Sequence, residues 1–129
     1  MNKKIVETVK APSAIGAYSQ AVIVENSTRS VYISGQIPLD PDSMELVSQE
    51  FTEQAQQVFK NLSAVAQAAG GALADAVKLT VYLTDLERFA ELNEIMSQYF
   101  SQPYPARAAV QVSALPKQVQ IEIDAILIM

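Results

Sequence analysis

The last quarter of the chain, from Pro103 to Leu127, constrains the fold more than any other stretch. Two runs rich in apolar and alternating residues are joined there around Leu115-Pro116-Lys117, which predicts two β-strands. The first run carries Arg107 and the second carries Glu122. Charged groups are costly to keep dry in a half-buried sheet, so each needs a partner or a ligand. We therefore take Arg107 and Glu122 as the first candidates for a chemical centre.

Two helices are expected before this stretch. Apolar residues recur at steps of three and four from Phe51 to Ala69, with Ser48 as the expected N-cap. Gly70-Gly71 then predicts a left-handed C-terminal cap. The second helix is expected over Leu86 to Phe100, with Asp85 as its N-cap.

The remaining periodicity is that of β-strands. Apolar and polar residues alternate over 77–84, and shorter runs precede the first helix, over 5–9, 15–25 and 29–34. The resulting order, β-β-β-α-β-α-β-β, predicts a single α+β domain over residues 1–129. Right-handed crossovers place both helices on one face of a six-stranded mixed sheet.

The opposite face of this sheet would have no helix to cover it. It is expected to carry a mixture of polar and apolar side chains, namely Tyr32, Thr80, Tyr82, Arg107, Glu122 and Ile126, or their neighbours. A face of this size and composition is more often buried by other subunits than left in water. The pattern therefore predicts a closed homo-oligomer.

The residue types that are missing restrict the chemistry. The chain has no cysteine and no histidine, which excludes disulfides, thiolate nucleophiles, imidazole bases and the usual zinc or iron ligand sets. Any catalysis has to use carboxylates, Arg, Lys, Tyr, hydroxyls or backbone amides. The net charge of −5 argues against nucleic-acid binding. No apolar run has the length of a membrane span, and charges interrupt any signal-peptide core, so a soluble cytoplasmic protein is expected.

A symmetric hairpin of the two final strands would bring the charged pair together. Pairing about Leu115-Pro116 places Ala109 opposite Glu122 and Arg107 diagonal to it on the same face. Arg107 would then offer a planar fork of donors to a substrate carboxylate, and Glu122 could hold a water molecule or move a proton. A structural ion pair on the sheet surface explains the same spacing.

Three further places offer a contact to a ligand. Ser34 and Gly35, at a strand end, present a hydroxyl and backbone N–H groups suited to an anion, although a plain turn has the same sequence. Tyr18 follows Gly16 and could place a phenol in a cleft, but an aromatic in a strand is also a common core residue. Asn93 points close to the buried side of the second helix, where a loop carbonyl or a ligand could satisfy it.

Together these residues form a family pattern. Its segments follow one another in unbroken order: IGAYSQ (15–20), SGQIP (34–38), VKLTVYLTDLERFAELN (77–93), PARAAVQVSALPK (105–117) and VQIEIDAI (119–126). With them the chain, from about Ala11 to Ile128, resembles the RidA (YjgF-type) reactive-intermediate deaminase family.

The resemblance implies a chorismate-mutase-like α+β fold and a homotrimer with clefts between its subunits. Active members hydrolyse enamine and imine intermediates, such as 2-aminoacrylate and 2-iminobutanoate, to 2-keto acids and ammonia, and need no metal or bound cofactor. Arg107 matches the arginine that clamps the substrate carboxylate, and Glu122 matches the glutamate that activates water. Tyr18 matches the cleft tyrosine and joins Arg107 and Glu122 as an expected catalytic residue. Substrate contacts are implied for Ser34, Gly35, Asn93 and Ala109.

Three departures from the family pattern put the substrate preference in question. Ala109 stands where many members carry cysteine, and Ala17 stands where proline is common. The segment Gln111-Val112-Ser113-Ala114 lacks a Glu and an Arg that are often found there. A non-catalytic trimer that binds metabolites, with a regulatory or chaperone-like role, is the alternative function. RNA cleavage, claimed for some relatives, fits poorly with the negative charge and the lack of histidine.

Overall fold

The computed structural model describes residues 2–129. The element order is the predicted one. Its strands are β1 (Asn2–Val6), β2 (Ala21–Glu25), β3 (Ser30–Gln36), β4 (Ala76–Leu83), β5 (Ala106–Gln111) and β6 (Ile121–Ile128). Its helices are α1 (Phe51–Ala68) and α2 (Phe89–Tyr99), with short 3-10 turns η1 (Leu73–Asp75), η2 (Leu86–Arg88) and η3 (Pro116–Gln118).

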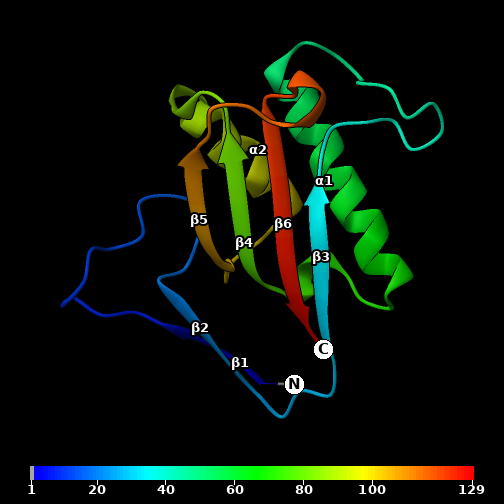
Figure 1. Ribbon diagram of the computed structural model, residues 1–129. Coiled ribbons are helices and arrows are strands. Elements are labelled where there is room, and N and C mark those ends of the chain that lie inside the picture. Colours follow the sequence, from blue (N-terminus) through cyan, green and yellow to red (C-terminus); the bar gives the residue numbers. More distant parts are fainter. Residues whose placement is uncertain (1) are drawn as a thin grey trace.

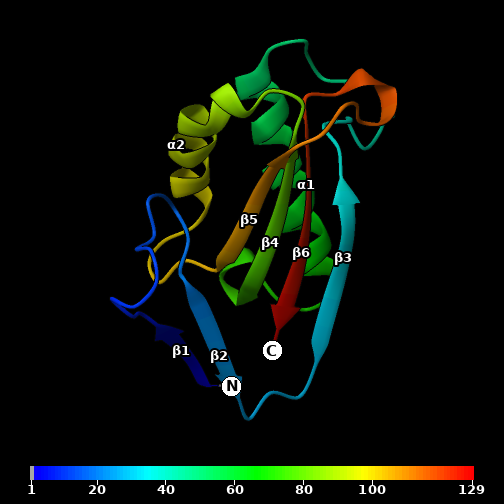
Figure 2. The ribbon, with the colours of Figure 1, turned by 60° about the vertical axis from the view of Figure 1, so that its left-hand side comes forward.

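The six strands are divided between two sheets, whereas one sheet was predicted. Strands β3-β6-β4-β5 form a four-stranded sheet, and β1 and β2 form a separate antiparallel pair that lies apart from β3 (Figures 1 and 2). The link between β2 and β3 is tied to the end of the chain, because the N–H groups of Thr28 and Arg29 both donate to the carbonyl of Met129. This link therefore does not close a β2–β3 hairpin.

The predicted hairpin of the last two strands is wrong, because β4 lies between them (Figure 1). Strand β4 runs parallel to β5, with Leu79 beside Arg107, and antiparallel to β6, with Tyr82 beside Glu122. Helix α2 connects β4 to β5, and such a crossover joins parallel neighbours. The crossover fixes β5 at the sheet edge and leaves the inner position to β6.

The helix ends follow the sequence signals in part. Ser48 is not the N-cap of α1: the helix begins after Glu50, and Ser48 Oγ accepts a hydrogen bond from the Glu50 N–H at 2.9 Å. Gly70 has the predicted left-handed conformation, with φ of 89°. Asp85 accepts a hydrogen bond from the Glu87 N–H and so caps η2, the turn that leads into α2.

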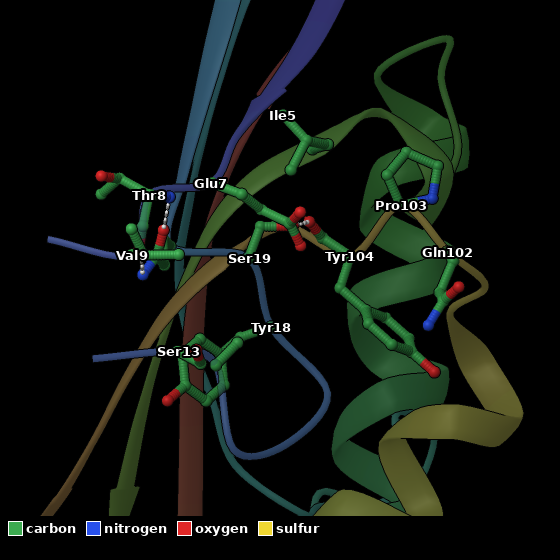
Figure 3. A pocket seen from close by; sticks show the side chains of 12 residues that line it. Ile5, Glu7, Thr8, Val9, Ser13, Tyr18, Ser19, Gln102, Pro103 and Tyr104 are labelled. Atoms are coloured by element: carbon green, nitrogen blue, oxygen red, sulfur yellow. Dashed lines mark hydrogen bonds between the residues drawn. The ribbon is translucent and has the colours of Figure 1, made fainter. Parts of the chain in front are cut away.

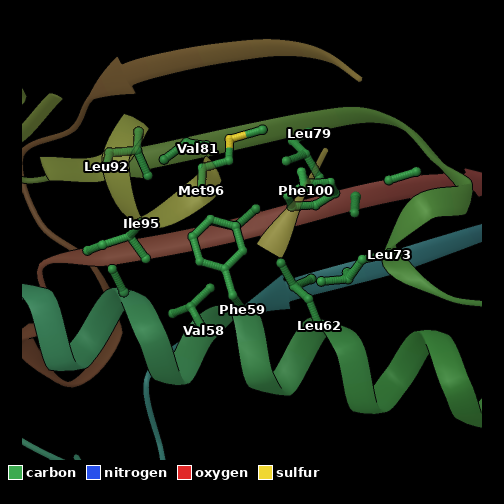
Figure 4. Close-up of a cluster of buried hydrophobic side chains, with 14 of the residues drawn as sticks. Val58, Phe59, Leu62, Leu73, Leu79, Val81, Leu92, Ile95, Met96 and Phe100 are labelled. Carbon is green, nitrogen blue, oxygen red and sulfur yellow. The ribbon is translucent and has the colours of Figure 1, made fainter. Parts of the chain in front are cut away.

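Both helices pack on one face of the four-stranded sheet, as expected, and bury the core between them (Figure 4). Alternate residues of the two central strands point into it: Leu79, Val81 and Leu83 from β4, and Ile121, Ile123, Ala125 and Leu127 from β6. Phe59 of α1 is fully buried and stacks on Tyr99 of α2 with ring centroids 5.2 Å apart. The other sheet face carries the intervening residues, and no helix within residues 2–129 covers it. Tyr32 on this face is 75% exposed.

Within residues 2–129, neither helix has the length and apolar character needed to cross a membrane.

Candidate active site

Arg107 lies in an aromatic and polar clamp between β5, α2 and the loop before β2. Its guanidinium carbon is 4.9 Å from the ring centre of Tyr18 and 5.0 Å from that of Phe89. Nη1 donates to Asn93 Oδ1 at 2.7 Å and lies 3.5 Å from the sulfur of Met96. Nη2 is buried and, within the described chain, has no hydrogen-bond partner. A buried donor without a partner is costly, so this atom is suited to an incoming acceptor.

No carboxylate in the described part of the chain forms an ion pair with Arg107. The ion pairs found among residues 2–129 join Lys4 to Glu25 and Arg88 to Glu91. Burial lowers the pKa of the Arg107 guanidinium, and the neighbouring Tyr18 opposes this shift. An arginine nevertheless stays protonated at all ordinary pH values. The clamp therefore holds an uncompensated positive charge, which favours binding of an anion.

The local sequence explains why these side chains meet. Arg107 is in register with the fully buried Leu79, so both point to the face of the sheet that the helices cover. Phe89, Asn93 and Met96 are spaced four and three residues apart on α2 and therefore share one helical stripe. Strand β5 and helix α2 thus bring the guanidinium and its partners together.

Glu122 lies on the opposite sheet face and contacts the bulge of β3. The register between β3 and β6 shifts between Ile33 and Gln36, which places Ser34 and Gly35 in a β-bulge. A Cβ on Gly35 would collide with the Glu122 carboxylate, at 2.8 Å from its Cδ. Glycine at this position therefore makes room for the carboxylate. Bulges of this kind commonly re-aim side chains beside active sites.

A phenol adds a further polar group to this face. Tyr82, in register with Glu122, donates its hydroxyl to Asp124 Oδ2 at 3.1 Å. This hydrogen bond and the charge of Asp124 raise the pKa of Tyr82, and Glu122 adds to the effect. The open face therefore combines two carboxylates with a protonated phenol.

The structure separates the predicted site residues into two groups. Tyr18, Asn93 and Ala109 accompany Arg107 on the helix-covered side, whereas Ser34 and Gly35 accompany Glu122 on the other side. The expectation that Arg107 lies on the open face is wrong, because the true strand order changes its register. Phe89 and Met96 also contact Arg107 but were not among the predicted site residues, although their spacing of four and three from Asn93 places them on the same helical stripe.

A hollow of about 680 Å³ opens next to the clamp, between the β1–β2 pair and residues 102–104 (Figure 3). Tyr18 lines it, together with Glu7, Ser19 and Tyr104. Neither Arg107 nor Glu122 lines this hollow. Tyr18 is thus shared between the hollow and the clamp.

Comparison with known proteins gives a consistent picture. The family model described as Endoribonuclease L-PSP matches residues 8–129. A human protein named 2-iminobutanoate/2-iminopropanoate deaminase is 50% identical over 98% of this chain and 90% of its own. The crystal structure of RidA from the Antarctic bacterium Psychrobacter sp. is 55% identical, with a TM-score of 0.76 over 98% of this chain and 99% of that chain. The structure of E. coli TdcF with bound serine is 42% identical, with a TM-score of 0.74 over 98% of both chains. The chain therefore belongs to the Endoribonuclease L-PSP family, which is the RidA (YjgF-type) family indicated by its sequence motifs.

Proposed function

We propose that this protein hydrolyses reactive 2-imino and 2-enamino acids, such as 2-iminobutanoate and 2-aminoacrylate, to 2-keto acids and ammonia. The observation that carries the proposal is the half-buried Arg107, which has no acidic partner among residues 2–129 and whose buried Nη2 donor is unpartnered there. These substrates are small anions with one carboxylate, which is what such a site binds. Relatives that are about half identical and bear the name of this deaminase support the assignment.

The chemistry needs orientation and a proton acceptor. The carbon of a protonated imine is already electrophilic, so a carboxylate held by Arg107 fixes the position of that carbon. Glu122 accepts a proton from the attacking water, the C–O bond forms, and the C=N electrons move to nitrogen. Glu122 then returns the proton to the amine nitrogen of the carbinolamine. The C–N bond breaks, ammonia leaves, and the hydroxyl oxygen forms the C=O bond of the keto acid while its proton passes to Glu122. Neither the attack of water nor the loss of ammonia requires a histidine or a cysteine, the two residue types that the chain lacks and that often serve in hydrolysis.

We further propose that each site is shared between two subunits of a homotrimer. Arg107 and Glu122 face opposite sides of the sheet, so one substrate molecule can reach both only if they come from different chains. No helix of the described chain covers the open sheet face that carries Glu122, and the exposed Tyr32 on this face suits a subunit interface. We also place the enzyme in the cytoplasm, close to the dehydratases that release such short-lived imines.

The test couples the purified protein to a threonine dehydratase, which releases the imine, and follows formation of 2-ketobutyrate. The protein is expected to speed keto-acid formation, and Arg107→Ala is expected to abolish this gain. Arg29→Ala, which removes an exposed arginine elsewhere on the chain, is the matched control and keeps the activity. Equal rates with and without the protein contradict the proposal. Binding of 2-ketobutyrate without turnover would favour the non-catalytic alternative.

A further inference from the structure

The free donor of the clamp is covered in this structure. Arg107 Nη2 is buried, with the ring of Tyr18 over one side of the guanidinium and Phe89 close by. A carboxylate cannot reach Nη2 unless one of these groups moves. Phe89 is the first residue of α2, whereas Tyr18 belongs to an irregular loop. The loop that carries Tyr18 is therefore better able to move aside than helix α2.

Residues 15–19, here called the strap, are anchored at one end and exposed at the other. The Ser19 N–H donates to the Pro105 carbonyl at 2.9 Å, and the Ser19 hydroxyl donates to the Tyr104 carbonyl. Ile15 at the opposite end is 82% exposed. Ser19 thus provides a fixed point for the strap, and lifting the rest of it would also expose Ala17, which is buried at 6% exposure.

A single hydrogen bond fastens the middle of the strap to helix α2. The Ala17 N–H donates to Asn93 Oδ1 at 3.2 Å, and in the described chain no other hydrogen bond joins residues 15–18 to α2. The same oxygen accepts from Arg107 Nη1 at 2.7 Å. Asn93 Oδ1 therefore connects the strap and the arginine directly.

We propose that the Ala17–Asn93 hydrogen bond is a latch that holds the strap over Arg107, and that an anionic substrate must open it to bind. Ala17 is then a positioning residue that acts through the strap and sets the affinity for carboxylates. The inference rests on the proposed function, because it takes Arg107 as the carboxylate site. The hollow lined by Tyr18 gives the lifted strap a space to occupy (Figure 3).

The latch depends on a backbone donor that proline does not have. Ala17→Pro removes the N–H, and proline is common at this position in the family pattern, so the fold should tolerate it. Ala14→Pro is the matched control: it adds a proline to the same loop at an exposed residue whose N–H makes no hydrogen bond in the described structure. Gly16→Ala opens the latch independently, since its Cβ would lie 2.7 Å from Asn93 Oδ1.

The experiment measures binding of 2-ketobutyrate by calorimetry and hydrogen exchange of the strap by mass spectrometry. Loss of one neutral hydrogen bond that competes with the ligand should tighten binding by about two- to tenfold in Ala17→Pro. Gly16→Ala should shift the affinity in the same direction, and Ala14→Pro should bind like the wild type. Saturating 2-ketobutyrate should speed exchange across residues 15–18 of the wild type and leave that of β4 unchanged.

The latch is overturned if folded Ala17→Pro binds 2-ketobutyrate no more tightly than the wild type does. It is also overturned if 2-ketobutyrate slows hydrogen exchange of the strap in the wild type. If Ala17→Pro does not fold, Gly16→Ala decides by the same criteria. A wild type that binds 2-ketobutyrate no better than Arg107→Ala overturns the proposed function and the latch together. If Arg107→Ala abolishes binding of 2-ketobutyrate but Ala17→Pro and Gly16→Ala leave the affinity unchanged, only the latch is overturned.

Discussion

Arg107 and Glu122 lie on opposite faces of one sheet, separated by strand β4. Arg107 is in register with Leu79 on the helix-covered face, and Glu122 is in register with Tyr82 on the open face. The proposed anion-binding group, Arg107, and the proposed proton acceptor, Glu122, therefore cannot reach the same molecule within one subunit. This separation leads to the proposal of a shared site and to the predictions below.

Arg107→Lys is expected to raise KM by at least about tenfold, although the positive charge remains. Lysine lacks the planar fork that lies within about 5 Å of the ring centres of Tyr18 and Phe89 and that offers Nη2 as a second donor. Steady-state kinetics with dehydratase-generated imine measure the effect. An unchanged KM would mean that a point charge suffices and that the clamp geometry has no role.

Gly35→Ala is expected to lower kcat by about ten- to hundredfold with little change in 2-ketobutyrate binding. The added methyl group collides with the Glu122 carboxylate and displaces it from the bulge of β3. The control is a double-mutant cycle: in a Glu122→Ala background, Gly35→Ala should have no further effect on kcat. Independent, additive losses would show that Gly35 acts by some route other than Glu122.

Gln54→Leu is expected to lower the free energy of unfolding by about 1–3 kcal/mol, even though it adds an apolar side chain to the core. Gln54 is fully buried; its Nε2 donates to the Ser48 carbonyl, and its Oε1 accepts from the Gln120 N–H. Leucine leaves both backbone groups without partners. Gln67→Leu on the exposed side of α1 is the matched control and should be nearly neutral in urea unfolding. Equal stability of the two variants would contradict this account.

The sequence patterns were sufficient to predict the order of helices and strands and most of the residues that form the core. Strict alternation predicted β4 and β6, and the steps of three and four from Phe51 predicted α1 almost to its last residue. These patterns succeed because burial on one face imposes the period of the element itself. Two of the candidate site residues, Arg107 and Asn93, contact each other in the structure, but their roles in the site stay predictions.

Strand order was not available from the same patterns. The two strands that follow one another in sequence, β5 and β6, were expected to pair. Their actual pairing depends on which side of β4 the α2 crossover places β5. That error moved Arg107 to the wrong face and placed it beside Glu122. The division into two sheets was equally hidden, because the alternation of apolar residues marks a strand without showing which strand it pairs with.

The most direct test of the shared site mixes two inactive variants. Subunits carrying Arg107→Ala and subunits carrying Glu122→Gln are combined into mixed trimers and assayed for imine hydrolysis. If each site takes Arg107 from one subunit and Glu122 from its neighbour, roughly one site in four contains both intact residues, so activity should return to about that fraction of wild type. Mixing Arg107→Ala with the Arg107→Ala/Glu122→Gln double variant is the control and should restore nothing. Mixed trimers that remain as inactive as their parents would contradict the shared site.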